Sequence, residues 1–437
     1  MRRALAGLTT RGRSFVAAGV ASTMCALGLG ERDLLRVGVF LLALPAVALA
    51  VVYRTRYRLS CTRRLNPPRV PAGQAASVVL RLENVSRLPT GVLLVEDTLP
   101  YVLGGRPRFV LDRVESQGVR EVSYPVRSDL RGRYRIGPLS VRLADPFGLC
   151  ELNRSFAAVD SLVVTPQITS LPPVRLRGEW AGAGESRARS VSSAGEDDVA
   201  TREYRQGDDL RRVHWRSTAR YGELMVRREE QPWQSRAAVL LDTREDAHRG
   251  DGPGSSFEWS VSAAASVGVH LSRSGYLIRL VTGDGDVTGD APGLGSGTAE
   301  SLLLDALAVV APTGRPSLGT ALTGARRASG DGLLVVVLGR LDPDEAELLS
   351  RLRRTATAGV AILLDTSTWA TLGARARAEA ATAFTARARL LRVAGWRVLP
   401  VRHGTSLGAV WPQAGTSAAR RTFEGSDPVV ASGGEPR

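Results

Sequence analysis

The chain has 437 residues, 43% of them hydrophobic, which is enough for two or three domains with sizeable cores. Its net charge is +15 and all 58 basic residues are arginine, but only 5% of residues are aromatic and no nucleic-acid-binding signature occurs, so nucleic acid is not an expected partner. Cys25, Cys61 and Cys150 form no CxxC pair, which argues against a disulfide framework and fits a reducing compartment.

Two apolar runs predict a transmembrane hairpin within residues 1–60. The runs cover residues 14–30 and 34–53, with residues 31–33 as a short turn, and each is about long enough to cross a hydrocarbon core of roughly 30 Å. Arginines flank both runs, and positive flanks stay inside, so both ends are expected in the cytoplasm. The flanking residues are Arg2, Arg3, Arg11, Arg13, Arg54, Arg56, Arg58, Arg63 and Arg64.

A cleaved signal peptide is the alternative, with Ala48-Leu49-Ala50 as its cleavage motif. Two separate runs, and the arginines after the second, favour the hairpin. We therefore expect a multi-pass protein of the plasma membrane whose soluble domains lie in the cytoplasm.

Residues 67–166 have the pattern of a β-sandwich. Apolar and polar residues alternate with a period of two in 76–83, 91–99 and 118–126, and Asn, Gly and Pro separate these runs. Further along, arginines alternate from Arg131 onward, and we expect them to form a solvated strand face.

Residues 236–411 predict a doubly wound α/β domain, because strands and helices alternate. Strands are expected over 237–242, 276–281, 332–338, 359–365 and 396–401, and helices over 257–273, 299–310, 342–354 and 374–393. No GxGxxG or GxxxxGK[ST] motif occurs, so no cofactor is predicted. The fold class is thus α+β multidomain: a hairpin, a β-sandwich and an α/β domain. Residues 167–200 are expected to be a linker and 412–437 a disordered tail.

Between linker and α/β domain lies a signature segment, residues 201–235, rich in arginines and carboxylates. Residues 210–220 predict a short helix and 224–229 a strand. Asp208, Asp209 and His214 form a candidate acid/base set, and Ser217 or Thr218 a candidate nucleophile that His214 would activate.

The hydroxyls lie three and four residues after the histidine, on its helix face, but nothing supplies an oxyanion hole. We therefore favour a structural or docking clasp, in which arginines pair with carboxylates and Trp215 anchors the segment in the α/β domain. Within this clasp, the arginines are expected against the carboxyl edge of the parallel sheet, although the amino edge is an alternative. Recognition of a partner at the surface of the segment comes second, and catalysis third.

Three features together resemble one family: the hairpin, the RGRYRIGPL…DPFGL region, and R-x-Y-x-x-G-D-x-x-R-x-x-H-W-x-x-[ST]-A-R before a strand. The third motif is read at Arg202, Tyr204, Gly207, Asp208, Arg211, His214, Trp215, Thr218, Ala219 and Arg220. The chain resembles the domain of unknown function 58 family of bacterial membrane proteins. The resemblance implies a von Willebrand factor A-like α/β domain, a location in the bacterial inner (plasma) membrane, and a MoxR-type AAA+ ATPase as partner. It implies no reaction.

A von Willebrand A domain binds a divalent ion through D-x-S-x-S after its first strand. Here the matching residues run from Asp242 to Asp246, and both serines are replaced, the first by Arg244. A guanidinium at that position opposes a cation, although Asp246 remains a candidate ligand. We therefore predict no metal at this degenerate site.

The function expected from the sequence is a membrane-tethered cytosolic scaffold or adaptor. The alternative is a hydrolase or nuclease that uses Asp208, His214 and Thr218.

Overall fold

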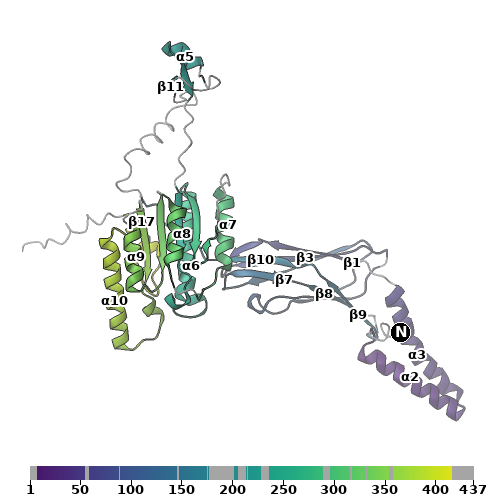
Figure 1. Cartoon of the computed structure of the whole chain (residues 1–437). Helices are drawn as coiled ribbons and strands as arrows, with labels where there is room; N and C mark the ends of the chain where they lie inside the picture. The colour runs from purple at the N-terminus through teal and green to yellow at the C-terminus, as the bar shows by residue number, and fades with distance from the viewer. Residues whose placement is uncertain are drawn as a thin grey trace, which may run out of the picture. The chain divides into compact units, whose positions relative to one another are not determined.

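The computed structural model describes residues 7–54, 59–87, 89–144, 147–174, 176, 201–204, 213, 215–227, 236–288, 296–314, 317–330, 332–353 and 358–415 (Figure 1). The chain divides into two compact units. The first runs to Gln167 and takes in Leu307–Val310, and the second comprises the remainder.

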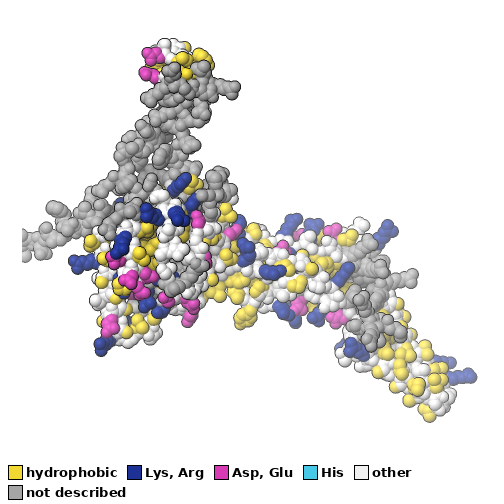
Figure 2. Space-filling view, in the orientation of Figure 1, with side chains coloured by type: hydrophobic (Ala, Val, Ile, Leu, Met, Phe, Trp, Pro, Cys, Tyr) yellow, Lys and Arg dark blue, Asp and Glu magenta, His cyan; other side chains and the backbone are white. Residues whose placement is uncertain are grey.

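The first unit begins with two long apolar helices, α2 (Thr10–Leu29) and α3 (Arg32–Arg54). Gly30, with φ at 75°, ends α2 in the left-handed conformation that glycine adopts without strain. The helices pack closely, since a Cβ on Gly38 would lie 2.5 Å from Thr23 Oγ1. By length and composition both helices are able to span a membrane. Hydrophobic side chains cover much of their visible surface (Figure 2).

The turn between the helices is shorter than the predicted 31–33. Arg32 and Asp33 already belong to α3, and Arg36 Nη1 donates to Asp33 Oδ1 at 2.8 Å. An acidic residue in the first turn is favoured by the helix dipole, which accounts for the earlier start.

Within the described residues, the rest of this unit is built from ten strands in three sheets. The first sheet has the order β1-β3-β6 and is antiparallel: β1 (Leu59–Asn66), β3 (Ala75–Asn84) and β6 (Val119–Arg127). The second, also antiparallel, has the order β5-β4-β8-β9: β5 (Arg108–Leu111), β4 (Leu93–Asp97), β8 (Leu139–Ala144) and β9 (Glu151–Phe156). The third has the order β2-β10-β7: β2 (Arg69–Pro71), β10 (Asp160–Thr165) and β7 (Gly132–Ile136).

One buried cluster joins the three sheets. Alternate residues of β3, namely Val78, Leu80 and Leu82, are fully buried in it, as the period-two pattern predicts. On β7, Arg133 and Arg135 are exposed, so the solvated strand face is confirmed for these two arginines.

Arg63 does not serve as a membrane flank, as its place in the sequence suggested. Its side chain is 3% exposed and forms a bidentate pair with Asp97, Nε to Oδ2 at 3.1 Å and Nη2 to Oδ1 at 2.7 Å. It also donates to Asp160 at 2.9 Å, and the Tyr124 hydroxyl donates to Asp97 at 2.6 Å. This network offsets the cost of burying the charges.

The second unit contains a six-stranded sheet of order β15-β14-β13-β16-β17-β18, parallel except for the short edge strand β15. Its strands are β13 (Arg236–Leu241), β14 (Leu277–Thr282), β15 (Gly285–Asp286), β16 (Leu333–Leu338), β17 (Ala358–Leu364) and β18 (Arg397–Val401). The helices that alternate with these strands are α6 (Ser256–Arg273), α7 (Ser296–Val309, whose residues from Leu307 belong to the first unit), α8 (Gly319–Ser329), α9 (Pro343–Arg353), α10 (Ala374–Val393) and α11 (Leu407–Val410).

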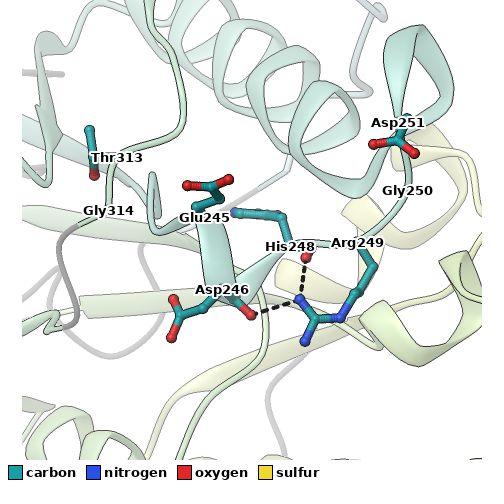
Figure 3. A pocket seen from close by; sticks show the side chains of 8 residues that line it. All are labelled: Glu245, Asp246, His248, Arg249, Gly250, Asp251, Thr313 and Gly314. Atoms are coloured by element: carbon teal, nitrogen blue, oxygen red, sulfur yellow. Dashed lines mark hydrogen bonds between the residues drawn. The ribbon is translucent and has the colours of Figure 1, made fainter.

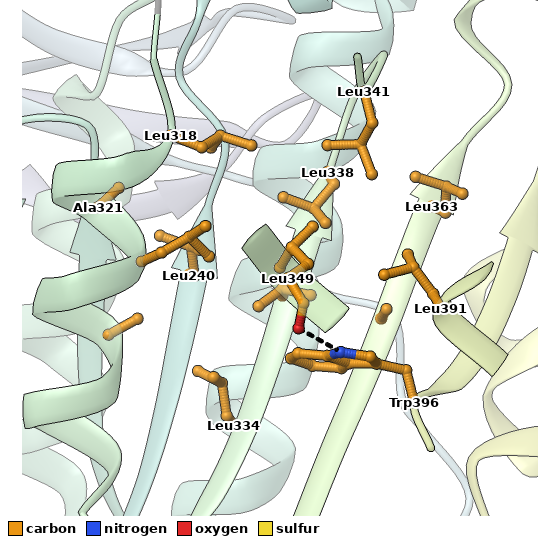
Figure 4. Close-up of a cluster of buried hydrophobic side chains, with 14 of the residues drawn as sticks. Leu240, Leu318, Ala321, Leu334, Leu338, Leu341, Leu349, Leu363, Leu391 and Trp396 are labelled. Atoms are coloured by element: carbon orange, nitrogen blue, oxygen red, sulfur yellow. Dashed lines mark hydrogen bonds between the residues drawn. The ribbon is translucent and has the colours of Figure 1, made fainter. Parts of the chain in front are cut away.

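Alternate residues of these strands face opposite sides of the sheet. On one side, Ala238 and Leu240 of β13 join a cluster with residues of α8, α9 and α10 (Figure 4). In the same cluster, Trp396 is 3% exposed and its indole N–H donates to Leu349 O at 3.0 Å. Helix α6 contacts β13, β14 and β16 as well. The near-continuous apolar strands predicted this burial on both faces.

Parts of the predicted linker and of the predicted tail make contacts within the second unit. Residues 168–174 and 176 fall in the predicted linker, yet Leu171 and Leu176 are 7% and 5% exposed, and Thr169 N donates to Ser266 Oγ at 2.9 Å. At the other end, Trp411 is fully buried and begins the short helix Trp411–Ala414. The rest of the predicted tail, residues 416–437, lies outside the described residues.

Candidate functional site

A buried cluster of charged side chains lies at the carboxyl ends of β13 and β16. It includes Asp242 and Arg244, two residues of the predicted degenerate metal site. Strand β13 ends at Leu241, and the chain continues through Asp242 into the short helix Glu245–Ala247. Asp242 N donates to Val337 O at 2.9 Å, which fixes Asp242 beside the neighbouring strand.

Arg244 fills this site with its guanidinium. Nε donates to Asp242 Oδ1 at 3.0 Å and Nη2 to Asp242 Oδ2 at 2.9 Å. The same Nη2 donates to Arg340 O at 3.0 Å, and Nη1 donates to Glu345 Oε1. Burial alone would lower the pKa of Arg244, but its hydrogen bonds to Asp242 and Glu345 and their charges raise it above the ordinary value.

The two carboxylates are satisfied by further backbone donors. Asp242 Oδ2 accepts from Gly339 N at 3.2 Å, and Asp242 Oδ1 accepts from Arg244 N at 3.2 Å. Glu345 Oε2 accepts from Asp342 N at 3.0 Å, which is a capping contact at the start of α9. A Cβ on Gly339 would lie 2.4 Å from Ala247 O, so only glycine fits there.

The structure therefore brings together Asp242 and Arg244 of the degenerate motif and leaves Asp246 aside. The Asp246 side chain is exposed, and its backbone carbonyl accepts from Arg249 at 3.0 Å. Glu345, the third member of the cluster, was not predicted. In the sequence, Glu345 stands three residues after Asp342 at the start of a predicted helix. That spacing indicates a helix cap, but it gives no indication that Glu345 pairs with Arg244.

A shallow hollow adjoins this cluster (Figure 3). Its rim carries the exposed carboxylates of Glu245, Asp246 and Asp251. His248 lies behind them, 7% exposed, with Nε2 2.9 Å from Asp242 O and Nδ1 3.2 Å from Ser256 Oγ. Because a carbonyl oxygen only accepts, Nε2 carries the proton and Nδ1 accepts from the serine. Burial lowers the pKa of His248, which keeps the ring neutral.

The signature segment contains a small hairpin. Strands β11 (Thr201–Glu203) and β12 (Met225–Arg227) are antiparallel and pair Arg202 with Val226. Val213 bridges to Val226, and helix α5 (Trp215–Tyr221) precedes β12. The predicted helix over 210–220 is thus shorter. Gly207, Asp208, Asp209, Arg211 and His214 lie outside the described residues.

The described side chains of this segment are mostly exposed. Trp215 is 70% exposed, Tyr221 64% and Leu224 40%. The guanidinium carbon of Arg220 lies 6.0 Å from the Tyr221 ring centroid. None of these contacts tests the predicted anchoring of the segment by Trp215, which stays a prediction. Tyr204 N donates to Leu224 O at 2.8 Å.

Thr218, the candidate nucleophile, has a structural contact. Its Oγ1 accepts from Met225 N at 3.0 Å, which joins α5 to β12. The hydroxyl thus caps the hairpin, although this contact leaves its proton available to another acceptor.

Two described residues that flank the signature segment in the sequence can be located against the parallel sheet. The carbonyl of Leu176 accepts from Arg397, the first residue of β18, at 3.1 Å. The chain rejoins the sheet at Arg236, the first residue of β13. Asp242 and Arg244 follow the carboxyl end of β13, so they lie at the opposite edge. Packing of the signature arginines against either edge of the sheet stays a prediction, because residues 205–212 and 228–235 lie outside the described residues.

The model of a family described as "Protein of unknown function DUF58" matches residues 200–367. The matched range starts before the signature hairpin and runs through β17, so it includes both the signature and the Asp242–Arg244–Glu345 cluster. Residues 200–367 are therefore similar to that family, for which no function is stated. No curated protein matches the chain.

Among solved structures, the CARDB domain of a Pyrococcus furiosus protein is 14% identical, with 25% of this chain and 90% of that chain covered and a TM-score of 0.19. A complex of Zinc 2-glycoprotein and Prolactin inducible protein from human seminal plasma is 14% identical, with 25% and 97% covered and a TM-score of 0.20. The ASH/PapD-like domain of human CEP192 is 15% identical, with 25% and 87% covered and a TM-score of 0.17. TM-scores this low do not identify a fold.

Proposed function

We propose that this protein is a membrane-tethered adaptor that presents its soluble units to a cytosolic partner, a MoxR-type AAA+ ATPase. The observation that carries this proposal is the exposed aromatic and basic surface of the signature hairpin, which we call the α5 face: Trp215, Arg220, Tyr221 and Leu224. Trp, Tyr and Arg are the residues that most often dominate binding energy at protein interfaces.

The contacts of the described residues favour binding over catalysis. Arg244 saturates the Asp242 carboxylate, so that carboxylate has no free position for a substrate or water. His248 is held neutral between a carbonyl and a serine, behind the rim of the hollow. Thr218 Oγ1 caps the hairpin. None of these groups forms an open pair of nucleophile and base.

We further infer that residues 236–411 form a von Willebrand A-like domain and that residues 67–166 form a β-sandwich. The short antiparallel edge strand β15, the parallel strands beside it and Asp242 directly after β13 support the first inference. In this domain, the Arg244 guanidinium takes the place of a divalent ion. The single buried cluster between the sheets supports the second inference.

The experiment is a binding measurement with the full-length protein in lipid nanodiscs and a purified MoxR-type ATPase from the same bacterium. Trp215→Ala should weaken binding by about tenfold or more, because a buried Trp at an interface contributes on the order of 2 kcal/mol. The matched control is Tyr101→Ala, since Tyr101 is 97% exposed but lies in the other unit.

Loss of binding with Trp215→Ala and retention with Tyr101→Ala would support the α5 face as the docking surface. Equal affinities of the wild type and both variants would show that the ATPase docks elsewhere. If no ATPase binds, but the protein turns over a phosphodiester or ester substrate and His214→Ala abolishes that turnover, the adaptor is wrong and the hydrolase or nuclease takes its place.

A further inference from the structure

Residues 147–150, which precede β9 and which we call the β8–β9 turn, pack against the base of the α2–α3 hairpin. Leu149 and Cys150, which end this turn, are 2% and 1% exposed. They form a buried cluster with Leu8 and Ala48, separate from the core of the three sheets. Phe15, Val16, Leu44 and Leu49 of the two helices pack against it. The contact therefore joins the turn to both helices through side chains.

Backbone hydrogen bonds hold the same contact. Thr9 N donates to Leu149 O at 3.0 Å, and Glu151 N donates to Gly7 O at 2.8 Å, so residues 7–9 pair with the turn as a strand would. Gly12 allows α2 to approach, because a Cβ there would lie 2.2 Å from Leu149 O. The turn is thus fixed at a defined height along both helices.

For helices that span a membrane, this height is where the edge of the hydrocarbon core would fall. From the turn at Glu31, about 20 residues at 1.5 Å each cross a hydrocarbon core of roughly 30 Å. The core would therefore end near residue 11 on α2 and near residue 51 on α3. Leu149 lies beside Gly12 and clusters with Ala48, so the turn lies close to this boundary on both helices.

The side chains at this level suit a membrane interface. Phe147 in the turn is 65% exposed, and Arg11 and Arg13 in the first turn of α2 are exposed. Aromatic rings are favoured at the level of the headgroups, and arginines pair with lipid phosphates.

We propose that the β8–β9 turn is a membrane-contact element that inserts Phe147 into the interface of a phospholipid bilayer. Arg11 and Arg13 lie at the phosphates of the same leaflet. This inference rests on the proposed membrane anchoring by α2 and α3. It adds a third point of attachment, which belongs to the β-strands and not to the helices.

The experiment measures depth with a fluorescent probe on single cysteines of the full-length protein, reconstituted in vesicles of phosphatidylglycerol and phosphatidylethanolamine. The background carries Cys25→Ser and Cys61→Ala, while Cys150 is buried and stays unlabelled. The probe is placed by Phe147→Cys, by Phe40→Cys in the middle of α3, or by Val110→Cys on β5. Phe40 and Val110 are 63% and 68% exposed, which matches Phe147.

A probe at residue 147 should shift its emission to the blue and lose intensity to lipids that carry a quencher near the headgroup. The probe at 40 should respond most to a quencher deep in the acyl chains, and the probe at 110 to neither. A probe at 147 that behaves like that at 110, while the probe at 40 reports lipid, would overturn the inference alone. An aqueous signal at 40 would instead overturn the membrane anchoring.

A second measurement uses the unaltered chain, in case a labelled variant fails to fold. A photoactivatable probe dissolved in the lipid phase should label the peptide that contains Phe147 as well as α2 and α3. Labelling of the helices without this peptide would contradict the proposal.

Discussion

At the scale of single residues, Arg244 decides what the carboxyl edge of the sheet can do. It places its charge between Asp242 and Glu345, and both carboxylates are buried or nearly so. Removal of one member of a buried ion cluster leaves the others uncompensated, which costs far more than removal of an exposed pair. The cluster also connects the end of β13 to the start of α9.

Arg244→Ala should therefore lower the free energy of unfolding by about 3–5 kcal/mol. The matched control is Arg340→Ala, since Arg340 is half-exposed and its side chain only approaches Asp342 at 3.9 Å, so its loss should cost about 0.5 kcal/mol or less. Denaturant unfolding of the full-length protein measures both. Equal, small effects would show that the cluster is not an integral part of the fold.

The same protein provides a test of the metal prediction. Millimolar Mg²⁺ should leave the melting temperature of the wild type unchanged, because an ion stabilises only a native state that binds it. A rise that Asp242→Ala abolishes would contradict the placement of Arg244 as the resident cation.

His248 should make stability depend on pH. Burial, opposed in part by the nearby Asp242, lowers the pKa of His248 below its ordinary value of 6.5, so below pH 6.5 the unfolded state takes up the proton before the folded state does. The contribution of the neutral His248 ring to the free energy of unfolding is then fully present above pH 6.5, and it is lost as the pH falls below that value. His248→Asn should reduce the slope of unfolding free energy below pH 6.5 by up to about 1.4 kcal/mol per pH unit.

Some residue-level features could be predicted and others could not. The sequence alone predicts that Arg244 opposes a cation, because an arginine stands at the position of the first serine ligand in the motif. Its partnership with Glu345 spans 101 residues and depends on the adjacency of β13 and α9. Arg63 reads as a basic flank because it follows an apolar run, and only the pairing of strands reveals that Asp97 is its partner.

At the scale of elements, a tight turn after β7 positions the buried Arg63 network. Gly137 has φ at 112°, and a Cβ there would lie 2.7 Å from Ala158 O and 3.1 Å from Arg63 Nη1. Arg63 itself donates to Ala158 O at 3.2 Å. The glycine is therefore needed for both its backbone conformation and the space it leaves.

Gly137→Ala should destabilise the protein by at least about 2 kcal/mol, since strain and a clash add together. Gly105→Ala is the matched control, because no atom lies within 4 Å of the added Cβ, and it should change stability by less than about 0.5 kcal/mol. Thermal unfolding of the two variants in parallel measures the difference in their stability. A Gly137→Ala variant as stable as the control would mean that the turn relaxes freely.

The sequence predicts long, strongly periodic elements well. Helix α10 begins and ends where expected, and β3, β6 and β13 agree within one residue at each end. Helix α8 was missed, because two glycines and two threonines interrupt its amphipathic pattern, although Ala321, Leu322 and Ala325 are buried. Residues 168–176 were expected to be a linker, since their composition hides the two leucines that pack.

At the scale of the whole molecule, the charge asymmetry around the apolar helices predicts topology. Arginines flank the outer ends of α2 and α3, whereas the turn between them carries Glu31, Arg32 and Asp33. A green fluorescent reporter fused after Arg437 should fluoresce, and a phosphatase reporter at the same place should be inactive, because positive flanks remain cytoplasmic. An active phosphatase would place the soluble units outside and remove the basis for a cytosolic partner.

The measurement that tests the adaptor most directly is photocrosslinking in the living bacterium. A photoreactive phenylalanine analogue is introduced at Trp215 on the α5 face, or at Tyr101 as the control, which is more exposed and lies in the other unit. The adaptor predicts that a MoxR-type AAA+ ATPase is crosslinked from position 215 and not from position 101. Crosslinks from position 215 only to lipid or to nothing, in cells that contain the ATPase, would contradict it.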